Sequence, residues 1–256
     1  MMGSPFEWLR SVARSRSDED QLASEAASAL SALAHDPAQL VVACRRLLEH
    51  HRSNAALWWI ASHMLASPEP AVAARRCHDM LTDDRTGSRL RDALPFCNEG
   101  ETVGAVGWAA PIAAALEERF DIDVVAIIDD DHHRARRRAG DRAALIEPWE
   151  LASSNTTLLL ISALAASPTQ LLVSHDAHEA LLEAPGATAW AVTSVGHLVA
   201  PRVFDAIRCA TERDESVRVI DYTRIAKVVG SRAVDEPADV ASRVDCPVAP
   251  ELLRPF

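Results

Sequence analysis

Acidic residues and histidines gather at two places in the sequence, where they could bind a divalent metal or transfer protons. One cluster is Asp129–His133 and the other is His175–His178. Carboxylate oxygens and imidazole nitrogens are common ligands of divalent metals. Lone surface histidines are also common, and His175, Asp176 and His178 fall in the first turn of an expected helix, where an acid suits the helix dipole. We therefore predict no metal site and no cofactor here.

A run of small residues at positions 104–110, Gly-Ala-Val-Gly-Trp-Ala-Ala, stands where an expected strand gives way to a helix. Small side chains let the backbone N–H groups at a helix start approach an anion such as phosphate. The spacing is not the GxGxxG of dinucleotide-binding loops. Two interpretations carry equal weight: a phosphate-binding loop at Gly107 and Trp108, or close packing of strand on helix, with Pro111 opening the helix.

Ser194, Gly196 and His197 form a second candidate loop, after a later expected strand. Serine and histidine this close suggest nucleophilic catalysis, but the sharp turn that exposes the serine of hydrolases is absent. Hydrogen bonds from Ser194 and His197 to a bound phosphate are a milder interpretation, and a plain turn is the simplest. Asp129 follows another expected strand, where a dinucleotide-binding fold holds a ribose hydroxyl, and a solvated loop acid is the alternative.

Arg52 and two adjacent tryptophans mark the start of an expected helix in the front third. Arg52 could reach an anion in a cleft between the front and back parts, or it could be an exposed arginine at a helix start. Trp58 and Trp59 cannot share one helix face because they are neighbours. We expect one of them in the core and the other at a contact with the back part or with a second copy.

The elements that must position these residues change character near residue 95. Before it, apolar residues recur at helical spacing over about 22–33, 37–48, 54–65 and 70–81, and one more short helix follows. Short loops between these helices indicate an antiparallel bundle.

From about residue 100 the pattern becomes short apolar runs separated by helical segments, which is typical of a parallel sheet covered on both faces. The expected strands are Thr102–Val106, Val124–Ile128, Ala143–Ile146, Thr157–Ile161, Ala187–Val192 and Val217–Ile220. We predict an α/β protein with an N-terminal helical bundle (1–95), a Rossmann-like doubly wound parallel sheet (96–230) and a C-terminal tail (231–256) over the surface. Ligands bind such sheets beyond the carboxyl ends of the strands, in the loops 107–111, 129–133, 162–169 and 193–201.

Composition restricts the class of partner. The 256 residues carry a net charge of −11, with 26 basic and 37 acidic residues, which argues against a general surface for nucleic acid or anionic membrane. The run 134–138 is rich in arginine, and we interpret it as a solvated helix face. The N-terminus has no signal-peptide pattern, and the apolar stretches are short for a membrane span. Five scattered cysteines suggest free thiols, so we expect a cytoplasmic protein.

Two stretches resemble one known family. The segment His51–His63 resembles the "RPS-x-x-x-L-x-N" helix in the front domain of translation initiation factor 2B alpha/beta/delta-related proteins, which include methylthioribose-1-phosphate and ribose-1,5-bisphosphate isomerases. The segments 157–167, 170–183 and 187–192 resemble the family's "D-x-V-L-V-G-A-D-A-I … N-K-x-G-T … P-F-Y-V" region. The resemblance implies a helical front, a Rossmann-like back and a phosphorylated ligand.

The sequence departs from this family at the residues that carry its isomerase chemistry. The loop after the first strand, where the family isomerases have a cysteine, reads Gly107-Trp108-Ala109-Ala110, and Cys97 comes before the strand. The acid of the family's "G-A-D" falls at Leu164, and the lysine of "N-K-x-G-T" has no counterpart. Acid–base transfer between neighbouring sugar carbons therefore lacks its agents.

The sequence leads to one main expectation and two alternatives. We expect a divergent family member that binds a sugar phosphate or nucleotide in a cleft between the helical and sheet domains as a homodimer, without the isomerase chemistry. The alternatives are an isomerase-like or nucleotide-dependent enzyme with relocated groups among Asp129, His175, Asp176 and His197, and a non-catalytic dimeric scaffold. The candidate ligand-binding residues are Arg52, Gly107, Trp108, Asp129, Ser162, Ser194, Gly196 and His197.

Overall fold

The computed structural model describes residues 19–129 and 132–254, with side-chain burial from residue 22 onward. Asp130 and Asp131 of the first acidic cluster lie outside the described residues, as does the N-terminal stretch from which the absence of a signal peptide is predicted. The chain folds into two compact units. Unit 1 comprises residues up to Asp84, Val195–Arg213 and the residues from Arg243 onward, and unit 2 comprises Arg85–Ser194 and Asp214–Ser242.

The two units are assembled from separated segments, whereas the domains expected from the sequence are consecutive. The reason lies in the path of the chain. After the strand β7 (Thr188–Thr193) the chain contributes the helix α10 (Pro201–Ala210) to unit 1, and it then returns to unit 2. The short helix α6 (Thr86–Ala93) belongs to unit 2 as well.

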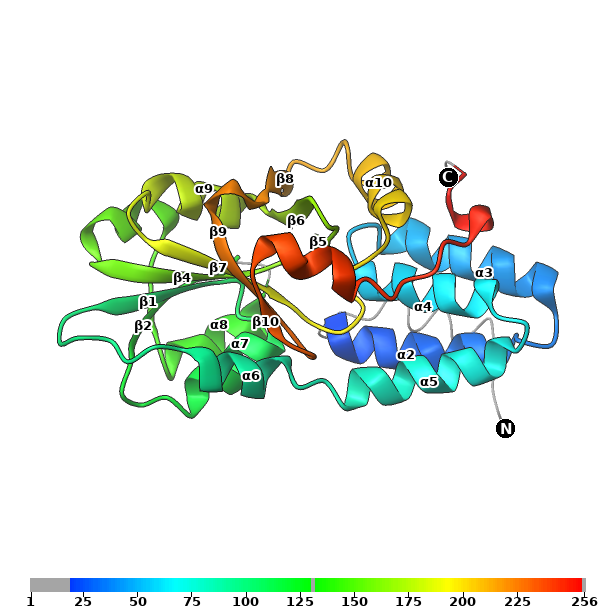
Figure 1. Cartoon of the computed structure of the whole chain (residues 1–256), viewed down its shortest axis with the longest axis horizontal. Coiled ribbons are helices and arrows are strands. Elements are labelled where there is room, and N and C mark those ends of the chain that lie inside the picture. The colour runs from blue at the N-terminus through cyan, green and yellow to red at the C-terminus, as the bar shows by residue number, and fades with distance from the viewer. Residues whose placement is uncertain (1–18, 130–131, 255–256) are drawn as a thin grey trace. The chain divides into compact units, whose positions relative to one another are not determined.

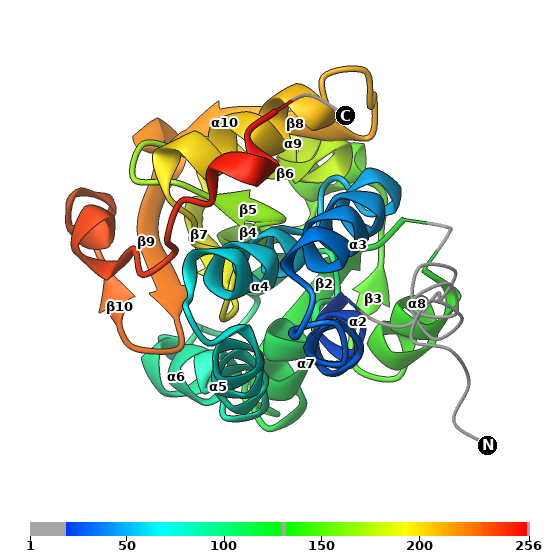
Figure 2. The same cartoon turned by 90° about the vertical axis from the view of Figure 1, so that its right-hand side faces the viewer.

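Unit 1 is a helical bundle, as expected. Its helices are α2 (Glu19–Ser31), α3 (Pro37–His50), α4 (Ala55–Ala66), α5 (Pro70–Thr82) and α10. The helix α4 is apolar around almost its whole circumference and is the buried centre of the unit, in contact with α2, α3, α5 and α10. Figure 2 views α2 and α5 close to end-on, while α10 lies across the view. The side chains of Asp36 and Asn54 cap α3 and α4 by accepting hydrogen bonds from Gln39 N and Leu57 N.

Both adjacent tryptophans are fully buried within the chain, so neither ring is accessible to a second copy. They point to different partners, as neighbours on a helix must. The indole Nε1 of Trp58 donates to the carbonyl of Arg52 at 3.0 Å, and that of Trp59 donates to Asp245 Oδ1 at 3.1 Å. The bundle itself therefore uses both rings.

The C-terminal segment is not simply laid over the surface. Cys246, Ala249 and Leu252 are buried within unit 1, and Arg45 Nη1 donates to the carbonyls of Glu251 and Arg254. The segment carries a few apolar side chains among polar residues and prolines, and this spacing has no period from which burial could be predicted.

Unit 2 contains a seven-stranded sheet in the order β10-β9-β7-β4-β1-β2-β3. Its strands are β1 (Thr102–Val106), β2 (Asp123–Ile127), β3 (Ala144–Leu145), β4 (Thr156–Ser162), β7, β9 (Ile225–Gly230) and β10 (Val234–Asp235). All neighbouring strands are parallel except β9 and β10. The predicted α/β fold with a doubly wound parallel sheet is therefore confirmed.

Helices cover both faces of this sheet, as a parallel sheet requires. In Figure 1, α6, α7 (Ala110–Glu117) and α8 (His133–Gly140) lie below the sheet, and α9 (His175–Glu183) lies above it. The helix α9 also packs on the 3-10 helix η1 (Pro148–Ser153). The remaining 3-10 helices are η2 (Tyr222–Arg224), η3 (Pro237–Arg243) and η4 (Pro250–Leu252).

One expected strand lies outside the parallel sheet. Residues Val217–Asp221 form β8, which pairs antiparallel with β6 (Gln170–Ser174) in a small sheet that also holds β5 (Ala165–Ala166). The place expected for it in the large sheet is taken by β9, which pairs parallel to β7. The two strands differ in burial, because β8 remains partly accessible along its length while β9 buries Ile225, Val228 and Val229.

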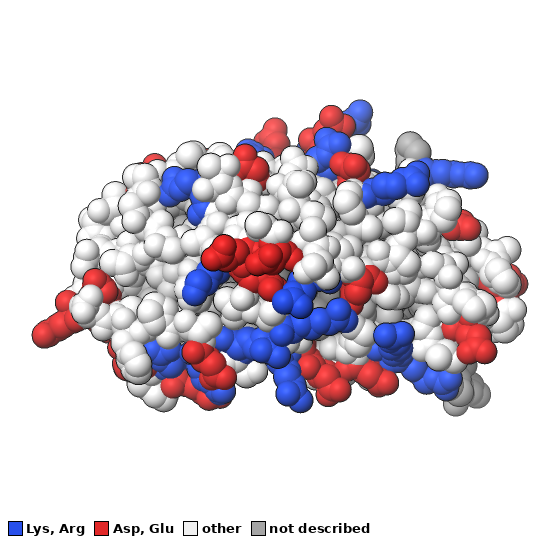
Figure 3. Space-filling view, viewed as in Figure 1, with Lys and Arg blue, Asp and Glu red and all other residues white. Residues whose placement is uncertain are grey.

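Two surface properties complete the description. Within the described residues, no helix has the length and apolar content needed to cross a membrane. Figure 3 shows acidic and basic side chains interspersed over one face, in line with a chain that carries both signs of charge and a net charge of −11.

Candidate functional site

The order of the strands reverses between β1 and β4, and the carboxyl ends of these two strands mark the topological switch point of the sheet. From β1 the chain proceeds to β2 and β3 on one side, whereas β4, β7 and β9 lie on the other. Val106 at the end of β1 is in register with Ile127 and Ile161, so the loops that follow these strands start at the same level. Such a switch point leaves a crevice in open α/β sheets, and ligands bind there.

Gly107 and Ser162 stand side by side at this switch point. Gly107 has a φ of +69°, in the left-handed region, and its N–H donates to the carbonyl of Ile127 at 3.0 Å. A Cβ added to Gly107 would lie 3.6 Å from the Cβ of Ser162. The absence of a side chain therefore keeps the Gly107 backbone open towards the Ser162 side chain, which is half-buried.

The first turn of α7 follows Gly107 directly. Ala109 precedes the helix in an extended conformation, Pro111 lies in its first turn, and α7 has no capping bond from a described side chain. The N–H groups of a helix start attract anions because they carry the positive end of the helix dipole. Gly104 belongs to β1 itself, where a Cβ would come 2.8 Å from Leu159 Cδ1, so this glycine serves packing and not a loop.

Trp108 lies between Gly107 and α7 with 5% of its surface exposed. Its ring belongs to the apolar core formed with Ile112 and Leu116, but its indole Nε1 has no hydrogen-bond partner among the described residues. Buried polar groups nearly always have partners, and an orphaned donor beside a candidate site is one that a ligand or a water molecule can satisfy.

Asp129 and Asp176 lie at this end of unit 2, close enough for the charge of Asp129 to act on the Asp176 carboxyl. Asp129 follows β2 and is exposed, while Asp176 lies in the first turn of α9. Partial burial raises the pKa of the Asp176 carboxyl, and the nearby charge of Asp129 raises it further. Sequence spacing could not predict this pairing, because α9 follows β6 and β6 belongs to the small antiparallel sheet.

The histidines of the second cluster are close to Asp176 in sequence. The Nδ1 atoms of His175 and His178 are buried and form no hydrogen bond in the described part of the chain, although His178 Nδ1 lies 3.5 Å from Glu179 Oε1. Over those same residues, no three histidine, cysteine or carboxylate side chains converge as metal ligands do.

The loop after β7 divides between the two units. Ser194 ends the first segment of unit 2 and is buried, while Gly196 and His197 belong to unit 1. Gly196 has a φ of +84°, and a Cβ there would meet the Cα of Ala56 at 3.1 Å. This glycine is needed for close packing on α4, which is the plain structural interpretation of the motif.

Arg52 and Asp84 also belong to unit 1. Arg52 is exposed, its Nε donates to the carbonyl of Glu49 at 3.1 Å, and its own carbonyl accepts the bond from Trp58. Asp84 Oδ2 accepts a hydrogen bond from Val195 N at 3.1 Å and so holds the start of the Gly196 loop. This role of Asp84 could not be predicted from the sequence, because the residue stands in a polar stretch without a recognisable motif. The expected ligand position between helical and sheet domains stays a prediction.

The described residues at the carboxyl edge of the sheet hold no counterpart to the cysteine and the "G-A-D" acid of the isomerases that the sequence resembles. The loop after β1 has no thiol, and the cysteine of unit 2, Cys97, precedes β1 at the opposite edge. Burial raises the pKa of the Cys97 thiol, which disfavours the reactive thiolate. Leu164 is apolar and lies between β4 and β5. Its N–H donates a hydrogen bond to the carbonyl of Leu172 on β6.

The structure thus defines a class: a helical bundle and a doubly wound parallel sheet with a glycine–serine pair at its switch point. No protein-family model matches the chain, and no curated protein matches it in sequence. Solved structures do match its fold. The Pyrococcus horikoshii OT3 translation initiation factor eIF-2B superposes with a TM-score of 0.70 at 12% identity, covering 93% of this chain and 98% of that one.

Two further structures show the same likeness. The tetrameric eIF2B-beta2-delta2 complex from C. thermophilum gives a TM-score of 0.67 at 13% identity over 93% of both chains. The delta subunit of eIF-2B from A. fulgidus gives 0.57 at 10% identity, over 93% of this chain and 89% of that one. The chain therefore has the fold of the eIF2B proteins, and the resemblance predicted from the sequence is confirmed at the level of the fold.

Proposed function

We propose that this chain is a divergent eIF2B-like protein that binds a small phosphorylated metabolite, a sugar phosphate or a nucleotide, without isomerase chemistry. The observation that carries the proposal is the pair Gly107 and Ser162 at the switch point of the sheet. A left-handed glycine, a hydroxyl and a helix start combine the groups that hold phosphate in α/β proteins. The orphaned indole N–H of Trp108 adds a further donor.

Binding without isomerisation follows from the residues at this edge. Transfer of a proton between neighbouring sugar carbons needs an acid and a base that flank the two carbons. The thiol and the carboxylate of the related isomerases are replaced by Gly107-Trp108 and Leu164, none of which exchanges a proton near neutral pH. The groups that could hold a phosphate remain.

A thermal-shift screen of the full chain tests the proposal. The probes are sugar phosphates, nucleoside mono- and diphosphates and dinucleotides, each beside its unphosphorylated counterpart. A ligand at about 100 times its dissociation constant stabilises the fold by roughly 2.7 kcal/mol, which is a shift of a few degrees. We expect a shift with a phosphorylated compound and none with its counterpart. A flat screen with a sharp melting transition would contradict the proposal and favour a scaffold.

The Asp129–Asp176 pair supports a second candidate, an enzyme with relocated catalytic groups. Two neighbouring carboxyls with unlike environments can serve as acid and base, and the raised pKa of Asp176 suits the acid. The test is to follow each phosphorylated sugar that binds by proton NMR. Conversion that Asp176→Asn abolishes, while binding persists, would establish this candidate in place of the first.

The assembly we propose is a homodimer in the cytoplasm. One structure of the same fold is a tetrameric complex of beta and delta subunits, which supports self-association for a chain of this fold. All five cysteines are free, which suits a reducing compartment. Sedimentation equilibrium of the purified chain would give the mass directly, and a monomer at all concentrations would contradict the dimer.

A further inference from the structure

Two phenylalanine rings are almost fully exposed in unit 2. Phe96 is 88% exposed and Phe120 is 85% exposed, and no other large apolar side chain of the described residues is as accessible. Phe96 lies in the loop before β1, and Phe120 lies in the turn between α7 and β2. Both loops precede their strands, so the rings lie at the amino edge of the sheet, opposite the candidate ligand site. Exposed large apolar groups that cluster on a protein mark interaction surfaces.

Two arginines link the loops that carry these rings. Arg119 lies over the Phe96 ring at 5.4 Å from its centre, and Arg142 lies over the Phe120 ring at 5.9 Å. The guanidinium of Arg119 also donates to the carbonyls of Leu94 and Arg91, and that of Arg142 donates to the carbonyl of Arg119. Each ring therefore has a guanidinium near one face while most of its surface remains in contact with solvent.

The surroundings of the two rings are acidic. The loops 95–101, 117–123 and 141–143 contain seven acidic and two basic residues, and the basic ones are Arg119 and Arg142. Arg119 is ion-paired with Asp121. Glu118 is ion-paired with Arg91, whereas five of the seven acids form no ion pair that the described residues show, so negative charge is in excess; they are Glu99, Glu101, Glu117, Asp123 and Asp141.

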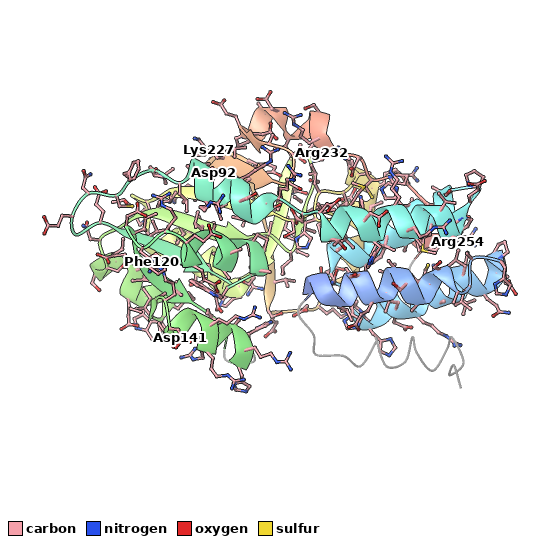
Figure 4. All side chains as sticks on the ribbon, turned by 90° about the horizontal axis from the view of Figure 1, so that it is seen from below. Asp92, Phe120, Asp141, Lys227, Arg232 and Arg254 are labelled. Carbon is pink, nitrogen blue, oxygen red and sulfur yellow. The ribbon has the colours of Figure 1, made fainter. Side chains whose placement is uncertain are left out.

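The figures agree with this charge distribution. In Figure 3 acidic side chains project at the left end, where Figure 1 places the loop before β1. Figure 4 labels Phe120 beside the end of α7 and Asp141 beside the end of α8, on adjoining parts of the same edge.

We propose that this edge, named the Phe96–Phe120 surface after its two rings, binds an arginine-bearing segment of a partner protein. The inference is independent of the ligand proposed for the opposite edge. Aromatic rings attract cations to their faces, arginine most often, and carboxylates around them complement a guanidinium by charge and by hydrogen bonding. A second copy of the same surface is a poor occupant, because a two-fold contact sets the seven acids against themselves.

Fluorescence anisotropy of the full chain with a labelled peptide tests the proposal. The probe is a short peptide in which arginine alternates with serine, beside the same peptide with glutamate in place of arginine. We expect binding of the arginine peptide and none of the glutamate peptide. We expect Phe96→Leu combined with Phe120→Leu to weaken binding about tenfold or more, because leucine keeps an apolar side chain but removes the ring face. Both positions are exposed, so the melting temperature should stay unchanged.

The matched control is Trp149→Leu, which removes another exposed aromatic ring of unit 2, located in η1. This change should leave the affinity as it is. Failure of the arginine peptide to bind, or equal weakening by the control and the double variant, would overturn the proposal. Self-association of the wild type that the double variant abolishes would instead assign the surface to a second copy.

Discussion

Gly107 directly follows β1 and Ser162 ends β4, two strands that are neighbours in the sheet although the residues are 55 positions apart in sequence (162 − 107), and a Cβ on Gly107 would lie 3.6 Å from the Cβ of Ser162. The relationship depends on the switch point between β1 and β4, where two loops leave the sheet at the same level. Together with the start of α7, it is the part of unit 2 best suited to hold a phosphate.

Substitution of Gly196 tests the close packing of its loop on α4. Gly196→Ala strains a left-handed backbone, which costs roughly 1–2 kcal/mol, and it crowds Ala56 and the Trp59 ring, which adds about 1–3 kcal/mol. Gly100→Ala is the matched control, because Gly100 has a φ of +82° and nothing within 4 Å of an added Cβ. Urea denaturation should show the larger loss for Gly196→Ala, and equal losses would refute the packing argument.

Removal of each indole N–H should loosen a different part of unit 1. Trp59→Phe removes one hydrogen bond to Asp245, so amide hydrogen exchange should accelerate in the buried C-terminal segment around Cys246 to Leu252. Trp58→Phe should instead accelerate exchange in the turn at Arg52. Each lost bond costs about 1 kcal/mol. Acceleration of the same amides in both variants would show that the two bonds do not act locally.

The five thiols should divide sharply in reactivity. Burial raises the pKa of Cys44 and Cys77 to about 12 and that of Cys246 to about 11, so these thiols stay protonated at pH 8. Cys209 is exposed and Cys97 partly so. Titration of the native protein with an aromatic disulfide at pH 8 should modify Cys209 first and Cys97 more slowly, and the others only after unfolding. Rapid reaction of a buried thiol would contradict the packing of unit 1.

The raised pKa of Asp176 predicts a pH-dependent effect of its removal. The carboxyl ionises more readily in the unfolded chain than in the folded one, so above the ordinary aspartate pKa its charge favours unfolding. Asp176→Asn should therefore raise the free energy of unfolding at pH 7 by a few tenths of a kcal/mol, since much of the group is accessible to solvent. The gain should vanish as the pH falls below the ordinary pKa, and a gain that grows towards acid pH would be the wrong sign.

Much of the fold follows from sequence patterns, and the exceptions have physical reasons. The strand β1 begins at Thr102 and ends at Val106, which are also the two bounds of its apolar run in the sequence. The strand β9 was not predicted from the sequence because Lys227 interrupts its apolar run. In the structure the ammonium group of Lys227 lies 4.7 Å from the centre of the Trp190 ring on β7. Such a lysine combines an apolar stem with an accessible charge, which no apolar pattern records.

Only those residues of the candidate site that lie at the ends of parallel strands could be predicted from the sequence. Gly107 and Asp129 follow strands and Ser162 ends one, and the carboxyl ends of these strands share one edge, so the common location of the three residues follows from the fold class. The electrostatic effect of Asp129 on Asp176 depends on the small antiparallel sheet, and the packing of Gly196 on Ala56 depends on the return of the chain to unit 1. Tertiary contacts of this kind leave no local trace in sequence.

Titration calorimetry with the strongest phosphorylated ligand tests the central claim most directly, using the wild type, Gly107→Ala and Gly100→Ala. Both substitutions put a methyl group on a glycine with a left-handed backbone, so each should lower the free energy of unfolding by a similar amount, roughly 1–2 kcal/mol. The two glycines lie at opposite ends of β1. Only Gly107→Ala fills the space beside Ser162. We predict wild-type affinity for Gly100→Ala and a loss of about tenfold or more for Gly107→Ala. Wild-type affinity in Gly107→Ala would show that the ligand binds elsewhere.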